Sequence, residues 1–189
     1  MKWCLRPHLL KLLGAVTIST VSSCQNSRYI TPPAQKIGAT LNSIAAEGNP
    51  QFSYDGRYLV YTSDRASKRS VYLYDLQRRR SIALPGLNQP GSMQSQADIS
   101  ADGRYVVYVS EQLGKSDVFL YNRLTAKSQN LTKNFIGEVR HPSISGNGRF
   151  VSFEGNRFGQ WDIEIYDRGT GIDFSTPQAP LVPNSESDE

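Results

Sequence analysis

The chain has little of the chemistry that many enzymes and metalloproteins use. Only two of its 189 residues are cysteine and two are histidine. Both cysteines, Cys4 and Cys24, lie close to the start, and His141 is the one histidine after residue 8. A disulfide framework and a cysteine nucleophile are therefore excluded beyond residue 24. A typical zinc site is excluded there too, because it needs several nitrogen or sulfur ligands.

The start of the chain is interpreted as a secretory signal peptide over residues 1–23. Three basic residues, Lys2, Arg6 and Lys11, precede a short apolar stretch at residues 12–18. This stretch is too short to span a bilayer. Without residues 1–23 the chain loses three of its 21 basic residues and none of its 17 acidic ones, which leaves a net charge of +1. The basic balance is confined to the signal, so we expect no nucleic-acid partner.

The segment Val21-Ser22-Ser23-Cys24 resembles a bacterial lipobox, in which the cysteine is lipidated and becomes the mature N-terminus. The alternatives are a plain signal peptide cut nearby and an uncleaved anchor. We expect lipidation of Cys24, attachment to the membrane through the lipid, and a periplasm-facing location in the cell envelope. The residue after Cys24 is Gln25, whereas an inner-membrane retention signal has aspartate there. We therefore expect the outer membrane rather than the inner membrane.

The remaining chain divides into three parts. Residues 24–36 contain two prolines among polar residues and are interpreted as a lipidated tether. Residues 37–173 form the folded domain, and residues 174–189 are interpreted as a disordered acidic tail. The middle part is long enough for one domain.

A twelve-residue pattern occurs three times in this domain. It begins at Phe52, Ile99 and Ile144 and reads as strand, turn and strand. The turn glycines lie 47 and then 45 residues apart, and a third strand ending at Asp75, Asn122 and Asp167 keeps the same spacing. A period of this length predicts a repeat architecture. The turn pairs are Asp55-Gly56, Asp102-Gly103 and Asn147-Gly148, which suit tight hairpins.

The strand after each turn is apolar on both faces, which indicates small sheets stacked against one another. The predicted fold is all-β, a partial β-propeller of about three four-stranded antiparallel blades near residues 50–88, 97–132 and 142–173. We expect the fourth, outer strand ahead of each triplet, at residues 37–46, 81–84 and 128–132.

The repeat resembles that of the TolB-like β-propeller family. The resemblance rests on Ser-x-Asp-Gly-Arg-aromatic, on Ser63-Asp64-Arg65 and on the strand ending Tyr72-Leu73-Tyr74-Asp75, and it covers about residues 38–170. It implies an envelope propeller that binds other proteins without a cofactor. Propellers close with roughly four to eight blades, so three are expected to leave open sheet edges and an exposed blade face. We expect completion by a second copy, by a partner, or within the chain through residues 37–43 beside residues 162–166.

The candidate contact residues are Arg140, His141 and Trp161. Arg140 and His141 are expected at a loop rim leading into the third blade, and Trp161 in another loop of that blade. The turn residues Asp55, Asp102 and Asn147 are expected to be structural, because one oxygen donor per blade does not make a calcium site. The recurring Arg57, Arg104 and Arg149 are expected to be solvent-exposed charges.

We expect a noncatalytic, envelope-anchored protein-interaction module with no metal and no cofactor. No Gly-x-Ser-x-Gly elbow is present, and nothing in the sequence brings Glu138 and Glu154 together as a glycosidase pair. The expected partners are envelope proteins, and a homodimer is a further alternative. A propeller that binds envelope glycan or peptide is the second candidate, and a hydrolase is the third.

The lipid anchor gives the first prediction. Cys24→Ser removes the thiol that would carry the lipid, so the protein should move from the membrane fraction to the soluble fraction after cell lysis. Immunoblotting of the two fractions measures this. An unchanged membrane fraction would count against the anchor.

Overall fold

The computed structural model describes residues 41–172. The predicted signal peptide (1–23), lipidation residue Cys24, tether (24–36) and acidic tail (174–189) lie outside the described residues. Within residues 41–172 there is no helix, and hence none that is long and apolar enough to cross a membrane.

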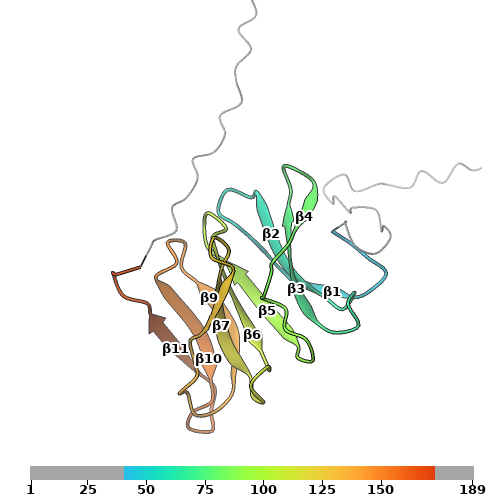
Figure 1. Ribbon diagram of the computed structural model, residues 1–189. Coiled ribbons are helices and arrows are strands. Elements are labelled where there is room, and N and C mark those ends of the chain that lie inside the picture. Colours follow the sequence, from blue (N-terminus) through green and yellow to red (C-terminus); the bar gives the residue numbers. More distant parts are fainter. Residues whose placement is uncertain (1–40, 173–189) are drawn as a thin grey trace, which may run out of the picture. The chain divides into compact units, whose positions relative to one another are not determined.

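Eleven strands occupy residues 41–172 and form three antiparallel sheets (Figure 1). The first sheet has the order β1 (Glu47–Phe52), β2 (Tyr58–Ser63), β3 (Ser70–Asp75) and β4 (Arg80–Ile82), and the second has β5 (Gln94–Ile99), β6 (Tyr105–Ser110), β7 (Asp117–Asn122) and β8 (Lys127–Asn130). The third has β9 (Val139–Ile144), β10 (Phe150–Gly155) and β11 (Asp162–Asp167), with β10 in the middle. The predicted all-β partial propeller is confirmed, and its third blade has three strands within the described range.

The outer strand differs from the expectation. It was expected ahead of each triplet, but β4 pairs with β3 and β8 pairs with β7, so it follows the triplet within the same sheet. Residues 41–46 form no strand. The physical reason is the short hairpin after β3 and after β7, in which Arg79 and Ala126 adopt φ of 51° and 53°. Such a turn places the next strand directly alongside.

The proposed closure through residues 37–43 lies partly outside the described residues. Within residues 41–172, β10 is the only strand that pairs with β11.

The three repeated turns have the same hydrogen bonds. Asp55 Oδ1 accepts from the Ser53 hydroxyl at 2.7 Å and from the Arg57 amide at 2.9 Å, and the Ser53 hydroxyl oxygen accepts from the Tyr58 amide. Asp102 and Asn147 repeat this arrangement with Ser100 and Ser145. The glycines that follow have φ of 67°, 73° and 76°. These side chains thus satisfy backbone groups that the tight turn leaves unpaired.

The recurring arginines were expected to be exposed, and the first and third instead make ion pairs that close their blades. Arg57 has a side chain only 16% exposed and contacts the buried Asp75 carboxylate at 3.2 Å. Arg149 contacts Asp167 with two hydrogen bonds of 2.8 Å. Because Asp75 and Asp167 end the third strand of their repeats, each pair ties that strand to the turn.

Two apolar clusters hold the sheets together. One lies between the first and second sheets and includes Tyr58, Val60 and Tyr108, and the other lies between the second and third and includes Tyr105, Val107 and Phe153. Every residue of β2 and β6 is buried. In β10 only alternate residues are buried. The third sheet is therefore covered on one face.

A ring packed on a turn glycine joins each sheet to the next. A Cβ on Gly103 would lie 2.5 Å from Cδ2 of Tyr58, and one on Gly148 would lie 2.8 Å from Cδ2 of Tyr105. Arg123 and Arg168 lie over the same two rings, 4.5 and 4.2 Å from their centroids, and each donates to the carbonyl of the glycine. We call this arrangement of ring, glycine and arginine the junction.

The junction gives the second prediction. Gly103→Ala adds a methyl group against Tyr58 at a left-handed φ, so we expect a loss of about 2–5 kcal/mol in the free energy of unfolding, from backbone strain and overpacking together. Gly159→Ala is the matched control, since φ is +87° there and nothing lies within 4 Å. It should lose only about 1–2 kcal/mol. Urea unfolding measures both, and equal losses would contradict the junction.

Candidate interaction surface

The predicted contact residues lie at one part of the third sheet. Arg140 and His141 are in β9, so the expectation of a loop rim was wrong for them. Trp161 lies in the loop between β10 and β11, as expected. His141 has φ of 48°, and Asn49 and Gln96 have φ of 50° and 51° at the same repeat position. A bulge in each innermost strand therefore turns these side chains out of the regular alternation.

Glu154 and Arg140 connect the three predicted residues in one group of contacts. Its Oε2 accepts from Arg140 Nε at 2.6 Å, and its Oε1 lies 3.1 Å from His141 Nδ1. The Arg140 guanidinium also lies 3.9 Å from the centroid of the Trp161 ring. We call Arg140, His141, Glu154 and Trp161 the Arg140 cluster. Glu154 was considered in the sequence only as a catalytic carboxylate, but its position directly opposite Arg140 in the β9–β10 pair would have indicated this contact.

Charge and hydrogen bonding fix the state of this carboxylate. The hydrogen bond from Arg140 lowers the pKa of Glu154, and His141 and the charge of Arg140 act in the same direction. An ionised carboxylate with two donors is held in place, as is the arginine over the indole ring. The Arg140 cluster is thus an ordered group of side chains at the surface.

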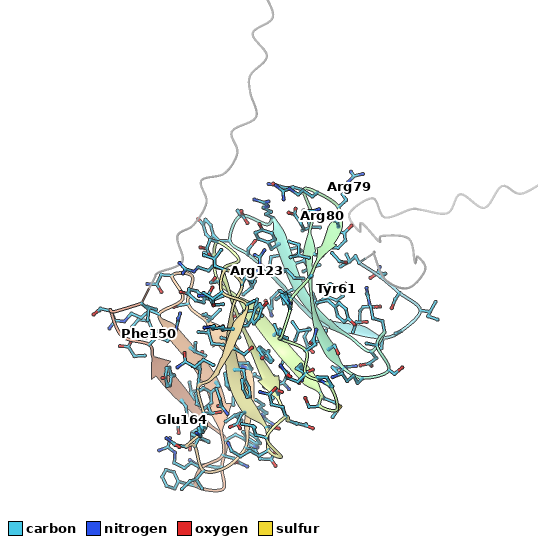
Figure 2. The ribbon with its side chains drawn as sticks, in the orientation of Figure 1. Tyr61, Arg79, Arg80, Arg123, Phe150 and Glu164 are labelled. Carbon is cyan, nitrogen blue, oxygen red and sulfur yellow. The ribbon has the colours of Figure 1, made fainter. Side chains whose placement is uncertain are left out.

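An apolar surface adjoins the cluster. Ile163 and Ile165 are 71% and 69% exposed, and the strand register places them beside Glu154 and Ser152 on the uncovered face of the third sheet. Phe150 lies on that face at the start of β10 and is 40% exposed (Figure 2). Three blades were expected to leave one blade face exposed, and the structure locates that face on the third sheet. The strand pattern alone did not indicate it, because these strands were expected to be covered on both faces.

Comparison with the other sheets shows what this face corresponds to. By the repeat spacing, Ile165 stands where Leu73 and Leu120 are buried, and Ser152 stands where Val60 and Val107 are buried. The exposed face of the third sheet is therefore the face through which the first and second sheets pack on the next one.

A polar cavity of about 260 Å³ lies where the three innermost strands meet. Asn49, Gln96 and His141 line it, together with Asp98 and Ser143. Gln96 Oε1 accepts from the His141 amide at 2.7 Å, and Asp98 Oδ2 accepts from the Ser143 hydroxyl at 2.8 Å. These polar groups tie the second and third sheets together across the cavity.

The same geometry bears on catalysis. Ser143 donates to Asp98 while the His141 ring faces Glu154, so the two side chains are not arranged as nucleophile and base. Within residues 41–172 no group of three or more His, Cys, Asp or Glu side chains is placed to hold a metal ion.

The fold and its open third sheet define a partial β-propeller, and comparisons with known proteins agree. No family model and no curated protein matches the chain. Among solved structures it resembles TolB from Acinetobacter baumannii with 19% identity and a TM-score of 0.57, over 70% of this chain and 32% of that one. A putative TolB from Agrobacterium tumefaciens has 21% sequence identity and a TM-score of 0.55, over 66% of this chain and 43% of that one.

A puromycin-hydrolysing peptidase from Mycobacterium tuberculosis gives 16% identity and a TM-score of 0.52, over 68% of this chain and 20% of that one. The chain thus spans less than half the length of each of these proteins. The likenesses establish a TolB-like β-propeller fold.

The Arg140 cluster gives the third prediction. A lowered pKa means that the ionised Glu154 stabilises the fold above the unfolded pKa of about 4.3, and that this contribution is lost as the pH falls through the folded pKa. Arg140→Gln should raise the pKa of Glu154 towards its ordinary value, as read by NMR titration of the carboxyl carbon. Arg157→Gln, which removes a comparable pair with Glu164, should leave it unchanged. The same Glu154 midpoint in both variants would contradict the cluster.

Proposed function

We propose that this protein is a noncatalytic protein-interaction module, held in the cell envelope by a lipid on Cys24 and facing the periplasm. The observation that carries the proposal is the uncovered face of the third sheet next to the Arg140 cluster. Arginine and tryptophan are the residue types that most often dominate binding energy at protein interfaces. The cluster supplies both in one contact, 3.9 Å apart.

The composition of the surface favours a protein as the ligand. Ile163 and Ile165 supply apolar area, and the cluster supplies charge and hydrogen-bonding groups at its border. Contiguous exposed apolar residues bordered by polar groups are typical of protein-binding surfaces. The TolB-like fold is consistent with this role but does not identify the partner, because one fold serves many functions.

The noncatalytic reading is supported by the placement of the polar groups. Glu154 is ionised and occupied by Arg140, and Asp98 is occupied by Ser143 and by the Ile144 amide. A general acid would instead need a raised pKa near the working pH. Glycan binding is the second candidate, because the Trp161 ring remains 40% exposed and sugars stack on such rings.

The test uses a matched pair of arginine variants. Arg140 and Arg157 are 41% and 44% exposed, each pairs with a glutamate of the third sheet, and each lies over an aromatic ring. Full-length tagged protein is crosslinked in cells, extracted in detergent and captured, as wild type, Arg140→Ala and Arg157→Ala. The proposal predicts an envelope protein that is captured with wild type and Arg157→Ala and is reduced at least fivefold with Arg140→Ala.

Two results would contradict this assignment. Equal capture by all three proteins would remove the Arg140 cluster from the interface. Binding of an envelope glycan that is abolished by Trp161→Ala, with no protein lost in Arg140→Ala, would favour the second candidate instead.

A further inference from the structure

The two junctions inside the molecule follow one rule. The aromatic residue that follows the turn arginine, Tyr58 or Tyr105, packs on the turn glycine of the next sheet. The next sheet also contributes an arginine that lies on the ring and donates to the carbonyl of that glycine. Each sheet therefore offers a ring to the sheet that follows and a glycine turn to the sheet that precedes it.

The two ends of the array each carry one half of a junction. Phe150 is the third ring of the series. It lies exposed on the third sheet, with the guanidinium of Arg149, the residue before β10, 4.7 Å from its centroid. Gly56 is the first glycine of the series. It has the same left-handed φ of 67°, and a Cβ there would meet nothing within 4 Å. Ring and glycine are thus both unmatched in the described chain.

The first sheet also carries the rest of the surface that the other junctions use. Tyr61 and Tyr72 stack with centroids 5.8 Å apart, as Tyr108 and Phe119 do at 5.7 Å. In the second sheet this pair lies against the sheet before it. In the first sheet Arg65 lies over the pair, and it is held at the Ser63 end of β2 by Ser63 and Glu47. Arg65 thus covers the Ser63 end of the pair, whereas at the other end of β2 a Cβ on Gly56 would meet nothing within 4 Å.

We propose that a second copy of this chain occupies the open face of the third sheet, with Phe150 of each copy packed on Gly56 of the other. Because the two copies exchange the same ring and glycine, the arrangement has two identical junctions and twofold symmetry, and it closes on itself. Two copies of three sheets give six blades, which is within the range of roughly four to eight that closed propellers use. This inference goes beyond the proposed function. Because the second copy and the envelope protein would use the same face of the third sheet, the dimer and the envelope complex exclude one another.

One residue makes the junction between copies weaker than those within the chain. Leu76 occupies the place of Arg123 and Arg168, since its amide donates to the Arg57 carbonyl as theirs donate to the carbonyls of Arg104 and Arg149. A leucine supplies no cation over the ring and no donor for the glycine carbonyl. Each of the two junctions between copies therefore lacks one cation–π contact and one hydrogen bond, and we expect a dimer that dissociates on dilution.

This difference permits a test in which association is strengthened as well as weakened. Sedimentation velocity on the detergent-extracted full-length chain, over a range of concentrations, gives the dissociation constant of the dimer. Phe150→Asp should weaken association at least tenfold. Phe158→Asp is the matched control, because Phe158 is 83% exposed in the β10–β11 loop, away from the junction, and it should have no effect.

Leu76→Arg restores the arginine of the internal junctions at both junctions of the dimer and should tighten the dimer by about five- to thirtyfold, the combined effect of two exposed cation–π contacts. In the double variant with Phe150→Asp, Leu76→Arg should not tighten the dimer, because the Phe150 ring that the arginine would contact is absent. A tightened dimer cannot arise from misfolding, so this variant decides the question if Phe150→Asp folds poorly.

Three results would overturn the proposal. They are a monomer at every concentration, a dimer unaffected by Phe150→Asp, and a Leu76→Arg gain that persists without Phe150. None of them excludes capture of an envelope protein by the single chain, because the Arg140 cluster is centred on Glu154, four residues after Phe150 in β10.

Discussion

The structure depends on a close approach between an aromatic ring and a glycine in the left-handed conformation. The glycine is required twice over at Gly103 and Gly148, because φ is positive and because a side chain there would overlap the ring of the preceding sheet. The turn, the stacking of sheets and the position of the arginine above the ring all follow from this contact. A repeat with any other residue at this position would neither turn so tightly nor pack so closely.

The same constraint explains why the third sheet, at the end of the array, exposes a packing surface. A face shaped to pack on another sheet remains exposed where no sheet follows, and the third sheet replaces part of its apolar surface with Ser152 and the ion-paired Glu154. This combination tolerates water when unoccupied and still offers Ile163, Ile165 and Phe150 to a ligand. A surface of this kind suits reversible binding better than permanent burial.

Much of this fold could be predicted from the sequence, because each repeat carries its own local signals. The Asp-Gly and Asn-Gly turns and the flanking β-branched and aromatic residues indicate hairpins without any knowledge of tertiary contacts, and the structure has strands at those places. The outer strands were assigned to the wrong blade, since their pairing depends on the left-handed turns at Arg79 and Ala126, residues that rarely mark such a conformation. The exposure of one blade face followed from the count of three blades, but the strand pattern did not single out Ile163 and Ile165. Their sequence is that of a covered strand, and only the number of sheets decides what covers it.

The candidate surface was predictable in part. Arg140, His141 and Trp161 were selected separately. The structure joins Arg140 and His141 through Glu154, whose role depends on strand register, and Trp161 joins them through the Arg140 guanidinium. The placement of Arg140 and His141 on a bulge rather than a loop goes with the positive φ of His141, which no motif indicates. Ion pairs between strands likewise escaped the sequence, because Arg57 and Asp75 are 18 residues apart and meet only when β2 and β3 pair.

The most direct test is amide hydrogen exchange of β10 at increasing protein concentration, with β2 and β6 of the same molecule as internal references. All three strands are paired on both sides, but only β10 has an uncovered face. If the third sheet carries the open face and a second copy covers it, β10 exchanges faster than β2 and β6 in dilute solution and becomes better protected as concentration rises. If β10 is as protected as β2 and β6 at every dilution, or exchanges at a rate that concentration does not change, an open face completed by a second copy is contradicted.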